Sequence, residues 1–86
     1  MQSVLNENDY FETSDLSLVA GLVACGAKIE AVDRTQGPRA NFYIRREPGM
    51  DGLVRAFYAH ELSVDAFAYF SALKEAKSRL YGPPIE

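Results

Sequence analysis

The chain contains one cysteine, one histidine and no tryptophan among its 86 residues. A single cysteine excludes a disulfide within the chain and a zinc site built from several cysteines, and a free thiol is typical of a reducing compartment. The longest uncharged apolar stretch, Leu16 to Ala27, is shorter than the roughly 20 residues that a membrane-spanning helix needs. We therefore expect a soluble, cytoplasmic protein without a membrane partner.

Basic residues are nearly absent from the first part of the chain. Residues 1–33 contain six carboxylates and a single lysine, Lys28. Residues 1–9 include Glu7 and Asp9 but no basic residue, so we expect neither a signal peptide nor a transit peptide there. The formal net charge is −3, yet residues 34–46 hold four arginines and no acid. A net acidic chain is thus expected to carry one basic hairpin.

The length permits one small domain. With 48% hydrophobic and 24% charged residues the composition is that of an ordinary globular protein. A chain of this size buries a thin core and has little room for a deep substrate cleft. We expect a single domain over residues 1–86, with flexible tails over residues 1–9 and over residues 82–86, the Gly-Pro-Pro end.

Hydrophobic periodicity predicts six elements. A short aromatic strand over residues 9–13 precedes a helix that begins at Leu16, with Ser14 or Asp15 as its cap and Gly26 just after its end. Residues 27–33 and 40–45 alternate between apolar and polar and predict two strands of a hairpin, joined by a loop that contains Gly-Pro. Helices follow over about residues 50–60 and, capped by Ser63 or Asp65, over residues 66–81. The order β-α-β-β-α-α predicts an α+β fold, in which a three-stranded, mostly antiparallel sheet has its helices packed on one face.

The apolar phase of each segment predicts the core. The helix from Leu16 is apolar almost all round, so we expect neighbours on more than one side, and Gly21 within it predicts that one of them approaches closely. In the hairpin Ala31 is expected to face the core, and Lys28, Glu30, Asn41, Tyr43 and Arg45 to share the opposite face. The predicted core consists of Leu16, Val19, Val23, Ile29, Phe42, Ile44, Leu53, Phe57, Phe70 and Leu73.

Two short motifs suggest a family. The run Tyr10-Phe-Glu-Thr-Ser-Asp-Leu16 precedes the apolar helix, and Val32-Asp33-Arg34 precedes the aromatic strand at Phe42. In this order they resemble a family of short bacterial and phage domains of unknown function. Leu73-Lys74 and Leu80-Tyr81 extend the resemblance over nearly the whole chain. The resemblance implies a small prokaryotic or phage domain and transfers no active residues.

Patterns that carry chemistry are weak. His60 lies near the predicted end of a helix, where an imidazole suits the helix dipole, and neither a nucleophile elbow nor a second zinc-binding histidine accompanies it. Cys25 is expected to be a small buried hydrophobe. Asp15 is interpreted as a helix cap, Asp33 as a turn acceptor and Glu12 as part of a solvated strand face. We therefore expect no catalytic, metal-binding or cofactor-binding residue, and no enzyme.

Two functions remain as hypotheses. The first is a non-enzymatic protein-interaction module that forms a homodimer and binds a protein partner that the sequence does not identify. A three-stranded sheet has two edge strands that can pair with a second copy. The helices also contain apolar residues beyond those of one buried stripe each, and these are available for an interface: Tyr58, Phe67 and Tyr81. The alternative is a domain that binds single-stranded nucleic acid, in which arginines contact the phosphate backbone and an aromatic ring stacks on a base. The residues for that alternative are Arg34, Arg39, Tyr43, Arg45 and Arg46.

Overall fold

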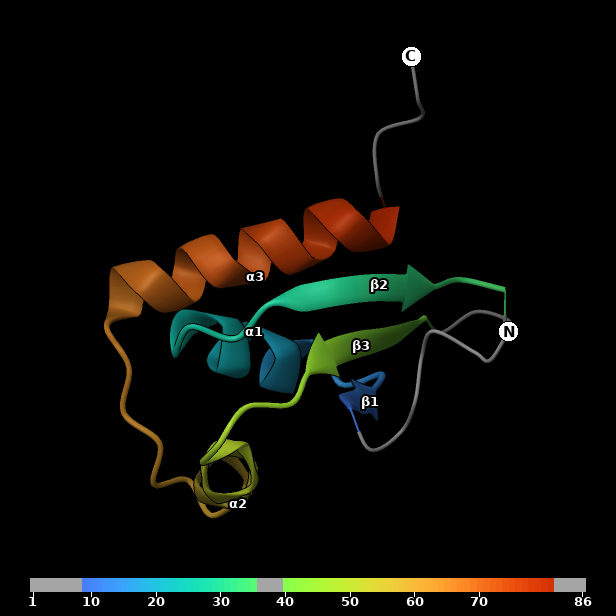
Figure 1. Cartoon of the computed structure of the whole chain (residues 1–86). Helices are drawn as coiled ribbons and strands as arrows, with labels where there is room; N and C mark the ends of the chain where they lie inside the picture. The colour runs from blue at the N-terminus through green and yellow to red at the C-terminus, as the bar shows by residue number, and fades with distance from the viewer. Residues whose placement is uncertain (1–8, 36–39, 82–86) are drawn as a thin grey trace.

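The computed structural model describes residues 9–35 and 40–81 and has the element order expected from the sequence (Figure 1). Its strands are β1 (Tyr10–Thr13), β2 (Ile29–Asp33) and β3 (Asn41–Arg45). Its helices are α1 (Leu16–Ala24), α2 (Met50–Tyr58) and α3 (Ala66–Tyr81). The predicted α+β fold is confirmed, while the expected tails, apart from Asp9, lie outside the described residues.

The sheet has the strand order β1-β3-β2, and both pairings are antiparallel. Phe11 and Ile29 each lie opposite Ile44, but the register of β2 shifts between Ile29 and Ala31. An extra residue in one strand reverses the alternation of side chains beyond it. Val32 therefore packs against the core, opposite Phe42, while Ala31 is paired with Tyr43. The prediction that Ala31 faces the core is wrong for this reason.

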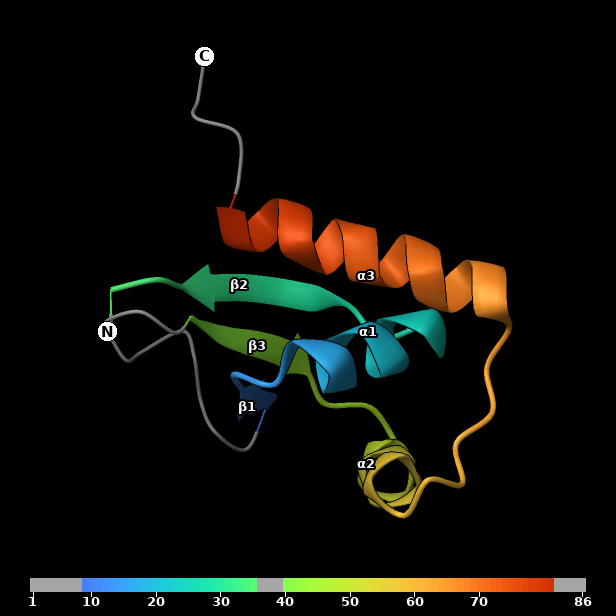
Figure 2. The same ribbon diagram turned by 180° about the vertical axis from the view of Figure 1, so that it is seen from behind.

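Helix α1 is the centre of the molecule. Its residues from Leu18 to Leu22 are all buried, which is more than one helical turn and requires neighbours on every side. The sheet covers one side, and α3 and α2 pack on the others (Figure 2). A Cβ atom added to Gly21 would lie 3.3 Å from Phe57 Cδ1 and 3.5 Å from Leu62 Cδ2. The close approach expected at Gly21 is confirmed.

The core joins α1 to the inner face of the sheet. Four of the predicted members, Val19, Ile29, Phe42 and Ile44, are buried. Leu18, Leu22, Met50 and Ala76 complete the buried cluster, which the sequence prediction did not contain. Further predicted members pack against it while partly buried, namely Leu16, Val23, Leu53 and Phe57.

Helix α3 packs on α1 through small residues. Ala72 and Ala76 are its buried side chains, and Leu73 is half-buried. Phe70 is 58% exposed, so its place in the predicted core is wrong. Ala76 lies six positions after Phe70, which puts the two side chains on different sides of a helix with 3.6 residues per turn. The alanine side faces inward because alanines let the two helices approach closely.

Polar side chains fix the helix ends. Asp15 Oδ1 accepts hydrogen bonds from the backbone N–H groups of Ser17 (3.1 Å) and Leu18 (3.3 Å), and Asp65 Oδ2 accepts one from Ala68 (2.9 Å). Of the two candidate caps predicted for each helix, Asp15 caps α1 and Asp65 caps α3. Gly26 has a φ of 106°, the left-handed conformation expected after α1.

Two tyrosines hold the start of α1 against the other helices. The hydroxyl of Tyr58 donates to Asp15 Oδ2 (2.8 Å), and that of Tyr69 donates to the carbonyl oxygen of Ser17 (3.2 Å). Hydrogen bonds from the side chains of Ser17 and Tyr58 lower the pKa of Asp15 below its ordinary value. The same bond, together with desolvation and the charge of Asp15, raises the pKa of Tyr58. This cluster joins all three helices at one point.

Candidate functional site

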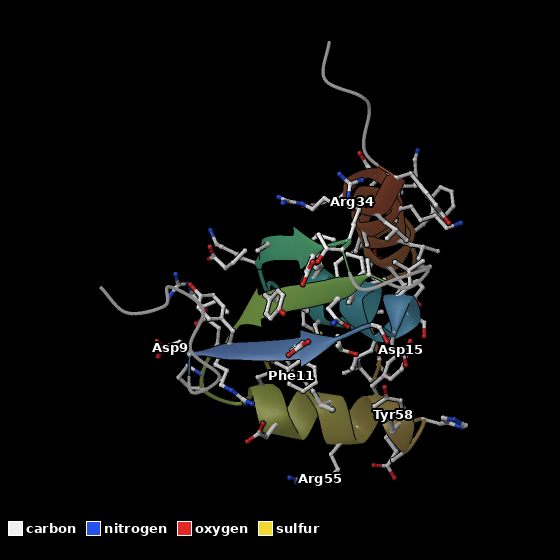
Figure 3. The ribbon with its side chains drawn as sticks, turned by 90° about the vertical axis from the view of Figure 1, so that its right-hand side faces the viewer. Asp9, Phe11, Asp15, Arg34, Arg55 and Tyr58 are labelled. Atoms are coloured by element: carbon white, nitrogen blue, oxygen red, sulfur yellow. The ribbon has the colours of Figure 1, made fainter. Side chains whose placement is uncertain are left out.

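The sheet face opposite α1 carries aromatic and charged side chains (Figure 3). Arg45 is its central cation. Its Nε atom lies 3.0 Å from Glu30 Oε2, and its guanidinium carbon lies 5.6 Å from the centre of the Tyr10 ring. The hydrogen bond and the charge of Glu30 raise the pKa of Arg45. The guanidinium is therefore already held by a carboxylate and a ring.

Tyr43 stands beside Arg45 on the same face. Desolvation raises its pKa, and the charges of Glu12 and Asp33 and a hydrogen bond to Glu12 act in the same direction. Glu12 lies directly opposite Tyr43 in the register of β1 and β3. Glu12 is exposed, as expected for a solvated strand face.

The structure separates the arginines of the predicted basic hairpin. Arg34 Nη1 donates to the carbonyl oxygen of Leu80 (2.8 Å), and Figure 3 shows Arg34 beside α3. Arg46 lies over the ring of Phe11 (5.7 Å) and 3.4 Å from Asp51, on the side of α2. Arg39 lies outside the described residues. Of the members of the predicted group that the structure describes, Tyr43 and Arg45 lie together on the open sheet face.

Carboxylates surround that remaining pair. Glu12, Glu30 and Asp33 all interact with Tyr43 or Arg45 on the open sheet face. Asp33 Oδ1 also accepts hydrogen bonds from the backbone N–H (2.9 Å) and hydroxyl (2.6 Å) of Thr35, which confirms it as a turn acceptor. Phosphate binding gains its affinity from uncompensated positive charge, and three carboxylates beside one arginine oppose it.

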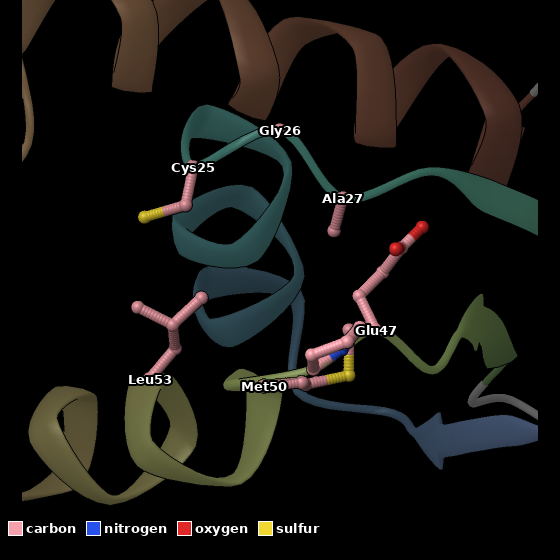
Figure 4. A pocket seen from close by; sticks show the side chains of 7 residues that line it. Cys25, Gly26, Ala27, Glu47, Met50 and Leu53 are labelled. Carbon is pink, nitrogen blue, oxygen red and sulfur yellow. The ribbon is translucent and has the colours of Figure 1, made fainter.

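A shallow depression lies between the end of α1 and the start of α2 (Figure 4). Its volume is about 230 Å³, smaller than the roughly 300–1,000 Å³ of typical ligand pockets. The Cys25 thiol and the Glu47 carboxylate point to opposite ends of it, and neither histidine nor lysine lines it. Cys25 is exposed, so the prediction of a buried residue is wrong. It follows the last turn of α1, just beyond the part of the helix that its neighbours enclose.

Metal-binding and catalytic constellations are not found in the described part of the chain. No group of three or more histidine, cysteine, aspartate or glutamate side chains there could hold a metal ion. His60 is exposed and follows α2 with a φ of 64°, where it closes the turn after the helix. No helix within residues 9–35 and 40–81 has the length and apolar character needed to cross a membrane.

The most exposed aromatic side chains belong to α3, where helical spacing places them on the side opposite the buried Ala72 and Ala76. Phe67 is 76% exposed, Tyr81 is 73% exposed, and Phe70 lies between them. Lys74 and Lys77 are exposed on the same side of the helix. We call these five residues the α3 seam: Phe67, Phe70, Lys74, Lys77 and Tyr81.

The seam is a feature that the sequence prediction missed in part. Phe67 and Tyr81 were recognised as apolar surplus, but Phe70 was assigned to the core and neither lysine was assigned to a binding surface. The spacing of three, four, three and four residues from Phe67 to Tyr81 was the available signal. That spacing keeps successive side chains on one side of a helix. The alanines at 72 and 76 indicated which side packs inward.

Comparison with known proteins gives a family and no nearer relative. No curated protein matches the chain, and no solved structure matches it. A family model described as a domain of unknown function, DUF5659, matches residues 8–82, which include every strand and helix. This agrees with the resemblance to an uncharacterised family of short domains. The chain belongs to the DUF5659 family.

Proposed function

We propose that this domain is a non-enzymatic protein-interaction module that binds its partner through the α3 seam. The observation that carries the proposal is the exposure of Phe67, Phe70 and Tyr81 along one side of a single helix. Single exposed apolar residues are common on protein surfaces, whereas several exposed aromatic residues on one side of a single helix are typical of an interaction site. Aromatic residues also contribute a large share of the binding energy in protein interfaces.

The rest of the molecule supports a binding role for this helix. Its inner side packs on α1 through the buried side chains of Ala72 and Ala76, so α3 is held in place before a partner binds. Asp65 caps its first turn, and Arg34 binds the carbonyl oxygen of Leu80 in its last turn. A rigid helix loses little conformational entropy on binding, which favours affinity.

A selection from a library of helical peptides tests the proposal. The full domain is the bait, and amide chemical shifts of the complexes locate the bound peptide. We expect the shifts to centre on residues 67–81. The doubly substituted Phe67→Ser, Tyr81→Ser domain should lose binding, whereas the matched Glu61→Ser, Glu75→Ser control should keep it. Peptides that bind both variants equally would contradict the proposal.

Self-association stays a separate prediction. The sheet order β1-β3-β2 makes β1 and β2 its edge strands, which are the positions where a second copy would add a strand. Sedimentation at high micromolar concentration is the measurement. A dimer would support self-association, and a species of 9.5 kDa alone would contradict it.

Binding of single-stranded nucleic acid is the second candidate function. The observation in its favour is that Tyr43 and Arg45 share the open sheet face. Titration with fluorescent oligonucleotides at two salt concentrations tests it. If this function is correct, Arg45→Ala should flatten the salt dependence and Tyr43→Ala should weaken binding at all salt concentrations. An absence of binding at low salt would contradict it.

A further inference from the structure

The α3 seam has the geometry of a surface that packs against another helix. Its members follow one another at intervals of three and four residues, from Phe67 to Tyr81. Such spacing forms the contact line of two helices that cross at a small angle. The seam occupies nearly all of the 16-residue helix, about 24 Å at 1.5 Å per residue. A partner helix of about four turns would cover it.

The middle of the seam is positively charged. Lys74 and Lys77 lie between the aromatic pair at one end and Tyr81 at the other. Lys74 Nζ is 5.3 Å from the centre of the Phe70 ring, so its ammonium group stays next to the apolar surface. The seam contains no carboxylate, and Glu75 next to it in the sequence is paired with Arg79 (3.6 Å). Charge at central positions of a helix pair selects the partner.

A second copy of this chain does not complement that charge. If two copies pair along the whole seam in antiparallel order, with Phe67 of one facing Tyr81 of the other, Lys74 meets the same residue of the second copy. In parallel order Lys74 and Lys77 both meet their own counterparts. Like charges at such positions cost binding energy, which disfavours symmetric pairing through α3.

We infer that the α3 seam binds an amphipathic helix of another protein whose apolar seam is interrupted at its centre by carboxylates. The carboxylates would face Lys74 and Lys77, and apolar residues on either side would pack on Phe67, Phe70 and Tyr81. The inference rests on the proposed function and adds the chemistry of the partner. Exposed ion pairs contribute modest affinity, so their main effect is to choose between helices of equal apolar character.

Three synthetic helical peptides test the inference against the full domain. Each carries leucine at three seam positions, and the two central positions hold glutamate, glutamine or lysine. We expect the glutamate peptide to bind about tenfold more tightly than the glutamine peptide, with the lysine peptide weakest. The difference should shrink as salt is added, because salt screens exposed charges. A second set with the seam order reversed reports the direction of the bound helix.

Charge reversal in the domain supplies the decisive variant. The Lys74→Glu, Lys77→Glu domain should prefer the lysine peptide over the glutamate peptide. The matched control is Lys28→Glu, Arg55→Glu, which changes the net charge equally at two exposed residues outside α3. This control should retain the wild-type order of affinities. Circular dichroism verifies that both variants fold.

The outcomes separate the inference from the proposed function. Glutamate and glutamine peptides that bind the seam equally would overturn the inference and leave the protein-interaction role intact. Binding of no helical peptide at the seam would overturn both. The inference would also be overturned if the domain bound an oligonucleotide or phosphatidylserine vesicles more tightly than the glutamate peptide, and if the Lys74→Glu, Lys77→Glu substitutions abolished that tighter binding. A dimer that shields Phe67 would overturn it as well.

Discussion

Helices α1 and α3 bury opposite kinds of side chain. In α1 large apolar residues such as Leu18 and Leu22 are enclosed on every side. In α3 the fully enclosed residues are Ala72 and Ala76, Leu73 and Leu80 are partly buried, and the aromatic residues Phe67, Phe70 and Tyr81 face solvent. The two helices pack on each other, so the small side chains of α3 let it approach the apolar surface of α1 closely. The difference shows that hydrophobicity alone does not decide which side of a helix turns inward.

The same amino acid should have opposite importance in the two settings. Phe42 packs in the core with α1, and Phe42→Ala should lower the free energy of unfolding by about 3–5 kcal/mol because it leaves a cavity. Phe67→Ala on the outer side of α3 should change it by about 0.5 kcal/mol or less. Urea denaturation measures both. Equal losses for the two variants would refute the contrast between the inner core and the outer side of α3.

Enlarging a small inward residue of α3 should separate the helices. Ala76 is fully buried, and Ala76→Leu should cost about 1–3 kcal/mol of unfolding free energy because the added atoms overfill the contact. Ala66→Leu is the matched control, since Ala66 is exposed in the first turn of the same helix. Thermal denaturation of the two variants checks the prediction. An unchanged midpoint for Ala76→Leu would show that α3 does not need small residues against α1.

The two helix caps should contribute differently to the free energy of unfolding. Asp15 at the start of α1 accepts bonds from Ser17, Leu18 and Tyr58, whereas Asp65 at the start of α3 bonds to Ala68. Asp15→Ala should cost about 0.5–2 kcal/mol of unfolding free energy, and Asp65→Ala less. Chemical denaturation of both variants gives the comparison. A larger loss for Asp65→Ala would contradict the importance assigned to the start of α1.

The start of α1 should also be sensitive to pH. The pKa of Asp15 is lowered in the folded protein. The contribution of the Asp15 carboxylate to the unfolding free energy is therefore present above pH 3.8, its ordinary pKa, and is lost as the pH falls. The pKa of Tyr58 is raised, so its contribution is present below 10.0 and is lost as the pH rises. Unfolding free energies measured at several pH values should show both losses. Tyr58→Phe should reduce the alkaline loss, leaving the part that comes from the raised pKa of Tyr43, and should weaken the acidic loss.

The smallest effect is expected on an exposed flank of α3. Glu75 and Arg79 form an exposed ion pair one turn apart, and Glu75→Ala should cost about 0.3–0.5 kcal/mol of unfolding free energy. High salt should abolish the difference because it screens the pair. Denaturation at two salt concentrations is the measurement. A loss that persists in high salt would indicate a packing role for Glu75.

Local patterns in the sequence predicted the elements because each pattern depends on a few neighbouring residues. Periodicity indicated the strands and helices, and Asp15, Asp65 and Gly26 marked helix ends that the structure contains. The apolar character of α1 on all sides correctly predicted that several neighbours enclose it.

Errors arose where a distant contact decides the result. The register shift in β2 turns Val32 rather than Ala31 toward the core, and a two-residue alternation cannot reveal it. Phe70 was assigned to the core from its hydrophobicity, although close contact with α1 favours alanine. The arginines of the candidate nucleic-acid site are close in sequence, but Arg34 and Arg46 contact different helices.

The central position of β3 also determines how the sheet opens. β3 is hydrogen-bonded to both of its neighbours, while β1 and β2 are each bonded to β3 alone. β2 pairs with β3 across a short connection, whereas α1 and β2 separate β1 from β3 in the chain. Closing the longer loop costs more chain entropy, so β1 gains less from its pairing. Hydrogen exchange should therefore begin at Tyr10–Thr13 and reach the amides of β3 last.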